Sequence, residues 1–143
     1  MRFWDSSALV AIMIPEAHTP AVEQLLTGDR ELVVWWGTPV ECQSAIYRQQ
    51  RSGLLLADAM QQAMIRIAYL LEDADRVPPV DQILDRAGRV LARHPLRAAD
   101  AFQLGAALTW SKDSAHGRGF VCLDDRLRAA AQTEGFTVLP AVL

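Results

Sequence analysis

Four acidic residues of this chain stand where a carboxylate is costly to bury. Asp5 ends the first apolar run and Asp124 ends the last clear one, whereas Glu41 and Asp100 lie near the starts of otherwise apolar, helix-like stretches. A carboxylate at the mouth of a core must be paired, protonated or bound to a cation, because an isolated buried charge costs much free energy. No lysine or arginine is an obvious partner, so the pattern predicts a hard divalent metal, which takes oxygen ligands. That indicates metal-assisted chemistry on phosphate.

Two of these acids also have ordinary structural interpretations. Asp5 is a good N-cap for a helix that follows it, but Ser6 and Ser7 can cap as well, so the ligand interpretation is favoured. Thr38 and Glu41 have the spacing of a capping box, in which the glutamate accepts a hydrogen bond from the backbone of the cap residue. On local grounds the capping role of Glu41 is favoured, and it does not exclude a place at the metal.

The sequence also leaves the roles of the other two acids undecided. Asp100 lies in a helical stretch with almost no solvated face, so it needs a partner, and Arg97 is the nearest candidate. Asp124 is followed by Asp125, and one of the two is expected to cap the helix that begins there.

Composition bounds the class of protein. The chain has 143 residues, 51% of them hydrophobic, which predicts one domain over residues 1–143 with a sizeable core. No apolar run is long enough to span a bilayer, and Asp5 interrupts the only N-terminal one, so we expect no membrane segment and no secretory leader. Cys42 and Cys122 lack a CxxC spacing, which favours reduced thiols and a cytoplasmic protein. The net charge of −3 indicates no general nucleic-acid surface.

Short apolar runs alternate with longer periodic ones. Strands are expected over residues 2–4, 31–36, 120–123 and 136–139, and helices over 6–14, 19–28, 38–53, 57–75, 80–93, 98–110 and 125–133. Strands separated by helices predict an α/β fold: a parallel sheet of about four to five strands with helices on both faces. Ligands of such sheets bind beyond the carboxyl ends of the strands, where Asp5 and Asp124 should both lie.

The four acids lie in four segments, which are Phe3-Trp4-Asp5-Ser6-Ser7-Ala8-Leu9-Val10, Pro39-Val40-Glu41 with the following Ala45 and Arg48, His94-Pro95-Leu96-Arg97-Ala98-Ala99-Asp100-Ala101, and Phe120-Val121-Cys122-Leu123-Asp124-Asp125-Arg126-Leu127. These segments resemble the PIN-domain ribonucleases, most closely the small VapC-type toxins of bacterial and archaeal toxin–antitoxin pairs. Their order and spacing cover essentially the whole chain. The third is the most specific and the second is the weakest.

The resemblance implies a PIN-like fold and a catalytic, metal-holding set of four acids: Asp5, Glu41, Asp100 and Asp124. Ser6 or Ser7 matches the hydroxyl residue that follows the first acid, and both are expected near the substrate. The implied cofactor is Mg²⁺ or Mn²⁺. Arg97 and Arg126 neighbour the acids and are expected to hold flanking phosphates of the substrate.

The implied activity is metal-dependent endoribonuclease cleavage of RNA phosphodiester bonds. The implied biological role is that of the toxin in a type II toxin–antitoxin pair. The implied partners are the RNA substrate, a small antitoxin protein and a second copy of the chain, because toxins of this family are commonly dimers. One alternative stays open: a catalytically silent PIN-like module that binds RNA or protein without cutting.

Overall fold

A parallel five-stranded sheet forms the centre of the molecule. The computed structural model describes all residues from 1 to 143, and the strands lie in the order β3-β2-β1-β4-β5. The strands are β1 (Arg2–Trp4), β2 (Leu32–Trp35), β3 (Asp75–Val77), β4 (Gly119–Val121) and β5 (Thr137–Leu139). All four neighbouring pairs are parallel. The α/β fold predicted from the alternating pattern is confirmed.

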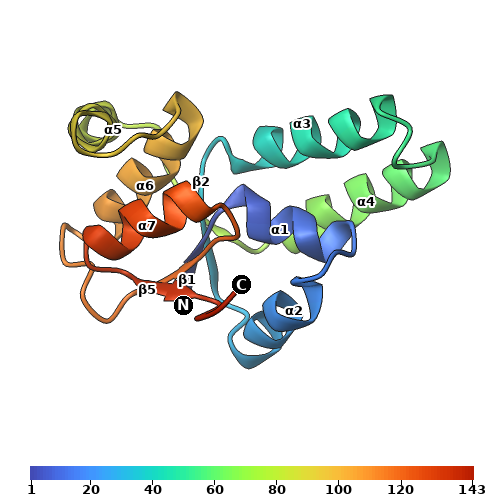
Figure 1. Ribbon diagram of the computed structural model, residues 1–143, viewed down its shortest axis with the longest axis horizontal. Coiled ribbons are helices and arrows are strands. Elements are labelled where there is room, and N and C mark those ends of the chain that lie inside the picture. The colour runs from blue at the N-terminus through green and yellow to red at the C-terminus, as the bar shows by residue number, and fades with distance from the viewer.

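Seven helices connect and cover these strands (Figure 1). They are α1 (Ser6–Met13), α2 (Thr19–Gly28), α3 (Thr38–Arg51), α4 (Ala57–Leu70), α5 (Asp81–Arg93), α6 (Ala98–Trp110) and α7 (Asp125–Thr133). Figure 1 shows α3 and α4 as an antiparallel pair that extends to one side of the molecule, while α5, α6 and α7 lie together on the other.

The sheet divides the core into two halves because successive side chains of a strand point to opposite faces. Phe3 and Val33 pack with residues of α5, α6 and α7. Trp4 and Val34, the next residue on each strand, pack with residues of α1, α2, α3 and α4. Strands buried on both faces explain why the sequence shows continuous apolar runs rather than alternation.

The predicted helix over residues 57–75 is wrong at its C-terminal end. The helix α4 ends at Leu70, and Asp75–Val77 form the edge strand β3, which pairs with Val33–Trp35 of β2. Asp75 and Arg76 are exposed, as is common for an edge strand. Their polarity concealed the strand, because only Val77 contributes to the core.

None of the helices combines the length and the apolar character that crossing a bilayer requires. The longest, α3 and α4, have 14 residues each. A helix that spans a bilayer needs about 20 residues.

Candidate active site

The four acids lie around the carboxyl ends of the central strands. Asp5 directly follows β1, and its backbone N–H donates to the carbonyl of Val121 at the end of β4, with an N–O distance of 2.9 Å. Asp124 comes three residues after the end of β4 and is the N-cap of α7. Glu41 and Asp100 lie in the first turns of α3 and α6. The meeting of Asp5 and Asp124 at one sheet edge, expected from their positions, follows from the pairing of β1 with β4.

Asp5 is both a helix cap and the most buried of the four acids, with 4% of its surface exposed. Its Oδ2 accepts hydrogen bonds from the backbone N–H of Ser7 (2.9 Å) and from the Ser7 hydroxyl. Burial raises the pKa of this carboxyl above its ordinary value, and the nearby charge of Asp100 raises it further. The capping interpretation of Asp5 is therefore confirmed, the site interpretation stays a prediction, and Ser6 is the first residue of α1.

Glu41 does not take part in the predicted capping box, so that interpretation is wrong. Gly37 is the N-cap of α3, which places Thr38 inside the helix with its side chain buried. Oε2 of Glu41 instead accepts hydrogen bonds from Ser6 Oγ at 3.1 Å and from Gln103 Nε2 at 3.0 Å. Burial, followed by the charge of Asp5, raises the pKa of this carboxyl.

Asp100 and Asp124 form the outer part of the site. Burial raises the pKa of Asp100, and the charge of Asp124 adds to the effect, although Arg97 and Arg126 act in the opposite direction. Oδ1 of Asp124 accepts from the backbone N–H of Leu127 at 2.9 Å, so Asp124, not Asp125, caps α7.

Three of the four acids, Glu41, Asp100 and Asp124, line two adjoining hollows, whereas the buried Asp5 borders neither. One, of about 480 Å³, is bordered by Ser6, Ser7, Glu41 and Asp124. The other, of about 640 Å³, is bordered by basic and acidic side chains together, namely Arg48, Arg97, Asp100, Asp124, Asp125 and Arg126. Two of the predicted phosphate-binding residues, Arg97 and Arg126, therefore border the same hollow as two of the acids. The two serines contact the acids: Ser6 donates to Glu41 and Ser7 to Asp5.

The donor set suits a hard, hydrated cation. No ion pair in the structure involves any of the four acids. Oδ1 of Asp5, Oε1 of Glu41 and Oδ2 of Asp124 make no hydrogen bond, yet none of them is fully enclosed by protein. No three acidic, histidine or cysteine side chains converge closely enough to bind one ion directly. This arrangement offers no site for a fully dehydrated ion, and the kind of ion that its free oxygens could hold is one such as Mg²⁺, which keeps several waters and needs only one or two carboxylates.

Sequence reasoning missed two residues that support the acids. Gln103 is fully buried and donates from one amide nitrogen to both Thr38 Oγ1 (3.1 Å) and Glu41. It lies three residues after Asp100, on the same side of α6. The sequence signal that could have identified Gln103 is a single amide side chain within an otherwise apolar helix. Cys122 is the second, because its thiol lies 3.6 Å from Oδ2 of Asp5 and burial raises the pKa of the thiol, keeping it neutral.

Comparisons with known proteins bear on the fold. No protein-family model matches the chain, and no curated protein does either. Among solved structures, the crystal structure of PAE2754 from Pyrobaculum aerophilum is similar with a TM-score of 0.64 and 20% identity, over 99% of this chain and 90% of that one. The crystal structure of VapC20 from Mycobacterium tuberculosis, a sarcin–ricin loop cleaving toxin, is similar with a TM-score of 0.63 and 20% identity, over 96% of this chain and 97% of that one. The chain thus has the PIN-like α/β fold of the VapC20 toxin, the fold that its four sequence segments implied.

Proposed function

We propose that this protein is a divalent-metal-dependent endoribonuclease that hydrolyses RNA phosphodiester bonds. The observation that carries the proposal is the group of acids at the carboxyl edge of the sheet, three of which have pKa values raised by burial and by one another. Such a group repels phosphate unless a cation lies between them. The fold adds support, because VapC20, which shares it, cleaves the sarcin–ricin loop.

In this proposal each side chain has a definite task. Asp5, Asp100 and Asp124 hold Mg²⁺ or Mn²⁺, directly or through waters, and Glu41 holds a second ion or a bound water. When bound, such an ion lowers the pKa of a water and stabilises charge on the scissile phosphate. Ser6 and Gln103 fix the orientation of Glu41 through its Oε2, leaving Oε1 free.

The arginines of the outer hollow have the complementary task. Arg97 and Arg126 border the hollow beside Asp100 and Asp124, where their guanidinium groups can hold phosphates next to the cut bond. The three arginines that border this hollow formally balance its three aspartates, so the hollow is not an acidic surface as a whole. Ser6 and Ser7 border the inner hollow, so contact with the substrate remains part of the proposal for them.

The first prediction tests catalysis directly. Asp5→Asn and Asp100→Asn should each lower the rate of single-stranded RNA cleavage in Mg²⁺ or Mn²⁺ by more than about 100-fold. Substituting a residue that only orients a metal ligand lowers activity by about 100-fold at most. Chelation should abolish cleavage by the parent. Asp58→Asn, at an exposed acid in the first turn of α4, is the matched control and should cut like the parent.

Two outcomes would contradict the catalytic assignment. If both site variants cut as well as the parent, the acids do not hold the catalytic metal. If the purified parent binds RNA but cuts none in either metal, the protein is the alternative, a catalytically silent PIN-like binding module.

We further propose that the enzyme is a cytoplasmic toxin that dimerises and is neutralised by a small antitoxin. Several exposed apolar side chains lie on α4 and on the connection that precedes it, namely Leu54, Leu56, Ile65 and Tyr69. Surfaces of this kind are typical of protein–protein contacts. Growth arrest on expression, with rescue by a co-expressed neighbouring gene product, tests the toxin role, and light scattering tests the dimer. The free, buried cysteines agree with a reducing compartment.

A further inference from the structure

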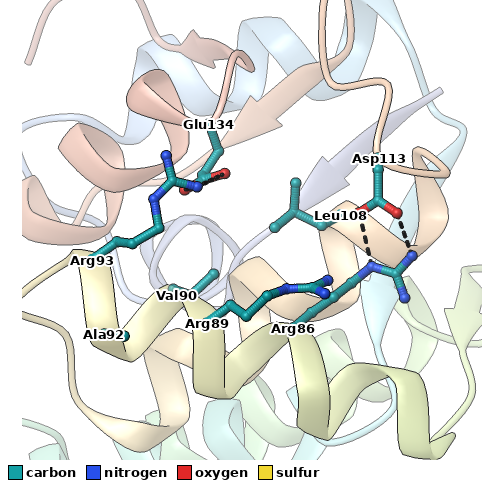
Figure 2. Close-up of a pocket in the computed structure, with 8 residues that line it drawn as sticks. All are labelled: Arg86, Arg89, Val90, Ala92, Arg93, Leu108, Asp113 and Glu134. Atoms are coloured by element: carbon teal, nitrogen blue, oxygen red, sulfur yellow. Dashed lines mark hydrogen bonds and ion pairs between the residues drawn. The ribbon is translucent and has the colours of Figure 1, made fainter.

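Three arginines of α5 point into one hollow that lies outside the acidic site. Arg86, Arg89 and Arg93 are spaced by three and four residues, so they lie along one side of the helix. The hollow has a volume of about 410 Å³, and the end of α6 and the residue after α7 complete its wall. Figure 2 shows the three side chains extending from α5 into this space. We call the three residues the arginine groove.

Two of the three arginines are held by acids. Arg86 donates from Nε to Asp113 Oδ1 at 2.9 Å, and a second hydrogen bond from Nη2 makes the pair bidentate. Arg93 lies 3.0 Å from Oε1 of Glu134. These pairs anchor the two ends of the groove and orient both guanidinium groups. Each guanidinium has five N–H donors, so several remain free for another acceptor.

Arg89 lies between these two pairs and has no hydrogen bond or ion pair of its own. In Figure 2 its guanidinium extends beside that of Arg86, toward the side of the groove where Asp113 lies. Three arginines and two carboxylates line the groove, so positive charge is in excess there, although the charge of Arg89 also lowers the pKa of Asp113. A planar guanidinium flanked by two others is suited to a phosphate.

The groove is connected to the acidic site along α7. A third hollow, bordered by His94, Pro95, Asp125 and Arg126 among others, lies between them. It shares Arg126 with the outer acidic hollow, and His94 directly follows Arg93 of the groove. The nine residues of α7 span about 14 Å, which sets the approximate scale of the separation.

We propose that the arginine groove binds backbone phosphates of the RNA strand beyond the cut bond, with Arg89 as the principal contact. The inference rests on the proposed function, because it extends the path of the same substrate. Arginine contacts of this kind position a strand without reading its sequence. The groove therefore favours longer RNA over short fragments, whatever their base composition.

Binding measurements on the chelated full-length protein test the groove separately from cleavage. The probes are fluorescent oligouridylates of about 4 and about 16 nucleotides, the range of lengths that single-strand binding sites cover. Arg89→Gln should weaken binding of the long probe about 3–10-fold and reduce the salt dependence by about one phosphate contact. Arg30→Gln is the matched control, because Arg30 is exposed, precedes the amino end of β2 and does not border the groove. It should bind both probes like the parent.

A second variant should act in the opposite direction. Asp113→Asn removes the carboxylate that holds Arg86 and should strengthen binding of the long probe about 3-fold or more. Asp113 has a positive φ of 57°, which asparagine also tolerates. Partial unfolding would weaken binding, so an increase cannot come from a loss of structure.

The outcomes separate this inference from the proposed function. If the parent cuts RNA and Arg89→Gln binds the long probe like Arg30→Gln, the groove proposal is overturned and the ribonuclease stands. If Arg89→Gln weakens binding of the long probe but the parent cuts nothing, the groove stands and the catalytic proposal falls. If the variant loses affinity only for polyglutamate and not for RNA, the groove binds an acidic polypeptide and the RNA proposal is wrong.

Discussion

One buried amide connects two helices beneath the acidic site. Gln103 of α6 donates to Thr38 and Glu41 of α3, while its own Oε1 has no partner. A buried amide oxygen without a partner costs free energy, and the structure tolerates that cost here. The gain is a Glu41 carboxylate with one oxygen held and one oxygen free. We interpret Gln103 as a positioning residue that acts through Glu41.

Gln103→Leu is therefore expected to impair catalysis without unfolding the protein. The variant keeps a similar volume but removes both hydrogen bonds, so cleavage should fall about 10–100-fold, as for other groups that orient metal ligands. The metal concentration for half-maximal cleavage should rise as well, which a purely structural role would not cause. Metal titrations of cleavage, with thermal unfolding alongside, provide the measurement. Gln62→Leu, at an exposed position of α4, is the control.

If Gln103→Leu lowers thermal stability yet leaves the metal dependence of cleavage unchanged, the amide serves packing alone. The positioning role of Gln103 would then be wrong, while the assignment of Glu41 to the site would remain.

At the scale of the elements, two helix caps are also members of the acidic site. Asp5 caps α1 and Asp124 caps α7, each through one carboxylate oxygen. A cap residue is held at the beginning of its helix, and here each cap lies within three residues of the end of a strand. The strand–cap–helix connection thus places a carboxylate at the carboxyl edge of the sheet with little conformational freedom, which is the property that a metal ligand needs.

This dual role separates two substitutions of Asp124. Asparagine keeps the capping oxygen but removes the charge, whereas alanine removes both. We expect both variants to lose cleavage, while only Asp124→Ala loses about 1 kcal/mol of unfolding free energy. Urea unfolding of both variants, compared with Asp125→Ala as the control for the neighbouring acid, measures the difference. Equal stability of the two Asp124 variants would show that the cap contributes nothing.

At the scale of the whole molecule, the acidic site opposes folding near neutral pH. The folded pKa values of Asp5, Glu41 and Asp100 are raised above their ordinary values, chiefly by burial. The folded state therefore binds protons more tightly than the unfolded state. The contribution of these three carboxyls to the free energy of unfolding is fully present at pH values below their pKa values in the unfolded state. It is lost as the pH rises through their higher pKa values in the folded state.

The chelated protein should accordingly become less stable as pH rises above the ordinary carboxyl pKa values of about 4. Asp29 and Asp113 have pKa values lowered by their ion pairs, so they remain ionised over this range and do not offset the trend. Asp100→Asn should flatten the pH dependence of stability. It removes one carboxyl with a raised pKa and also removes the repulsion between that carboxylate and its acidic neighbours. Thermal unfolding in chelator at several pH values measures both.

Added Mg²⁺ supplies the complementary control for this pH dependence. A ligand that binds only the folded state stabilises it by about 2.7 kcal/mol at a concentration 100 times its dissociation constant. The parent should gain stability from the ion at neutral pH, and Asp100→Asn should gain much less. A parent whose stability is the same with and without Mg²⁺ or Mn²⁺, at every pH, would contradict the metal site.

Much of this molecule follows from local sequence signals. The apolar runs, their periodicity and the residues that begin helices correctly predicted four of the strands, the parallel sheet and the positions of Asp5 and Asp124. Short apolar runs and helical patterns depend on neighbouring residues, so they are visible without the fold. The edge strand Asp75–Val77 was missed because its polar residues carry no such pattern.

Only tertiary structure decided the contacts between distant residues. The sequence favoured a capping role for Glu41, but its partners are Ser6 and Gln103, which lie 35 and 62 positions away. The groove of Arg86, Arg89 and Arg93 likewise exists because α5 packs beside the end of α6 and the residue after α7. Hydrogen bonds and ion pairs at such separations depend on how helices pack on the sheet, and that packing is a property of the whole chain.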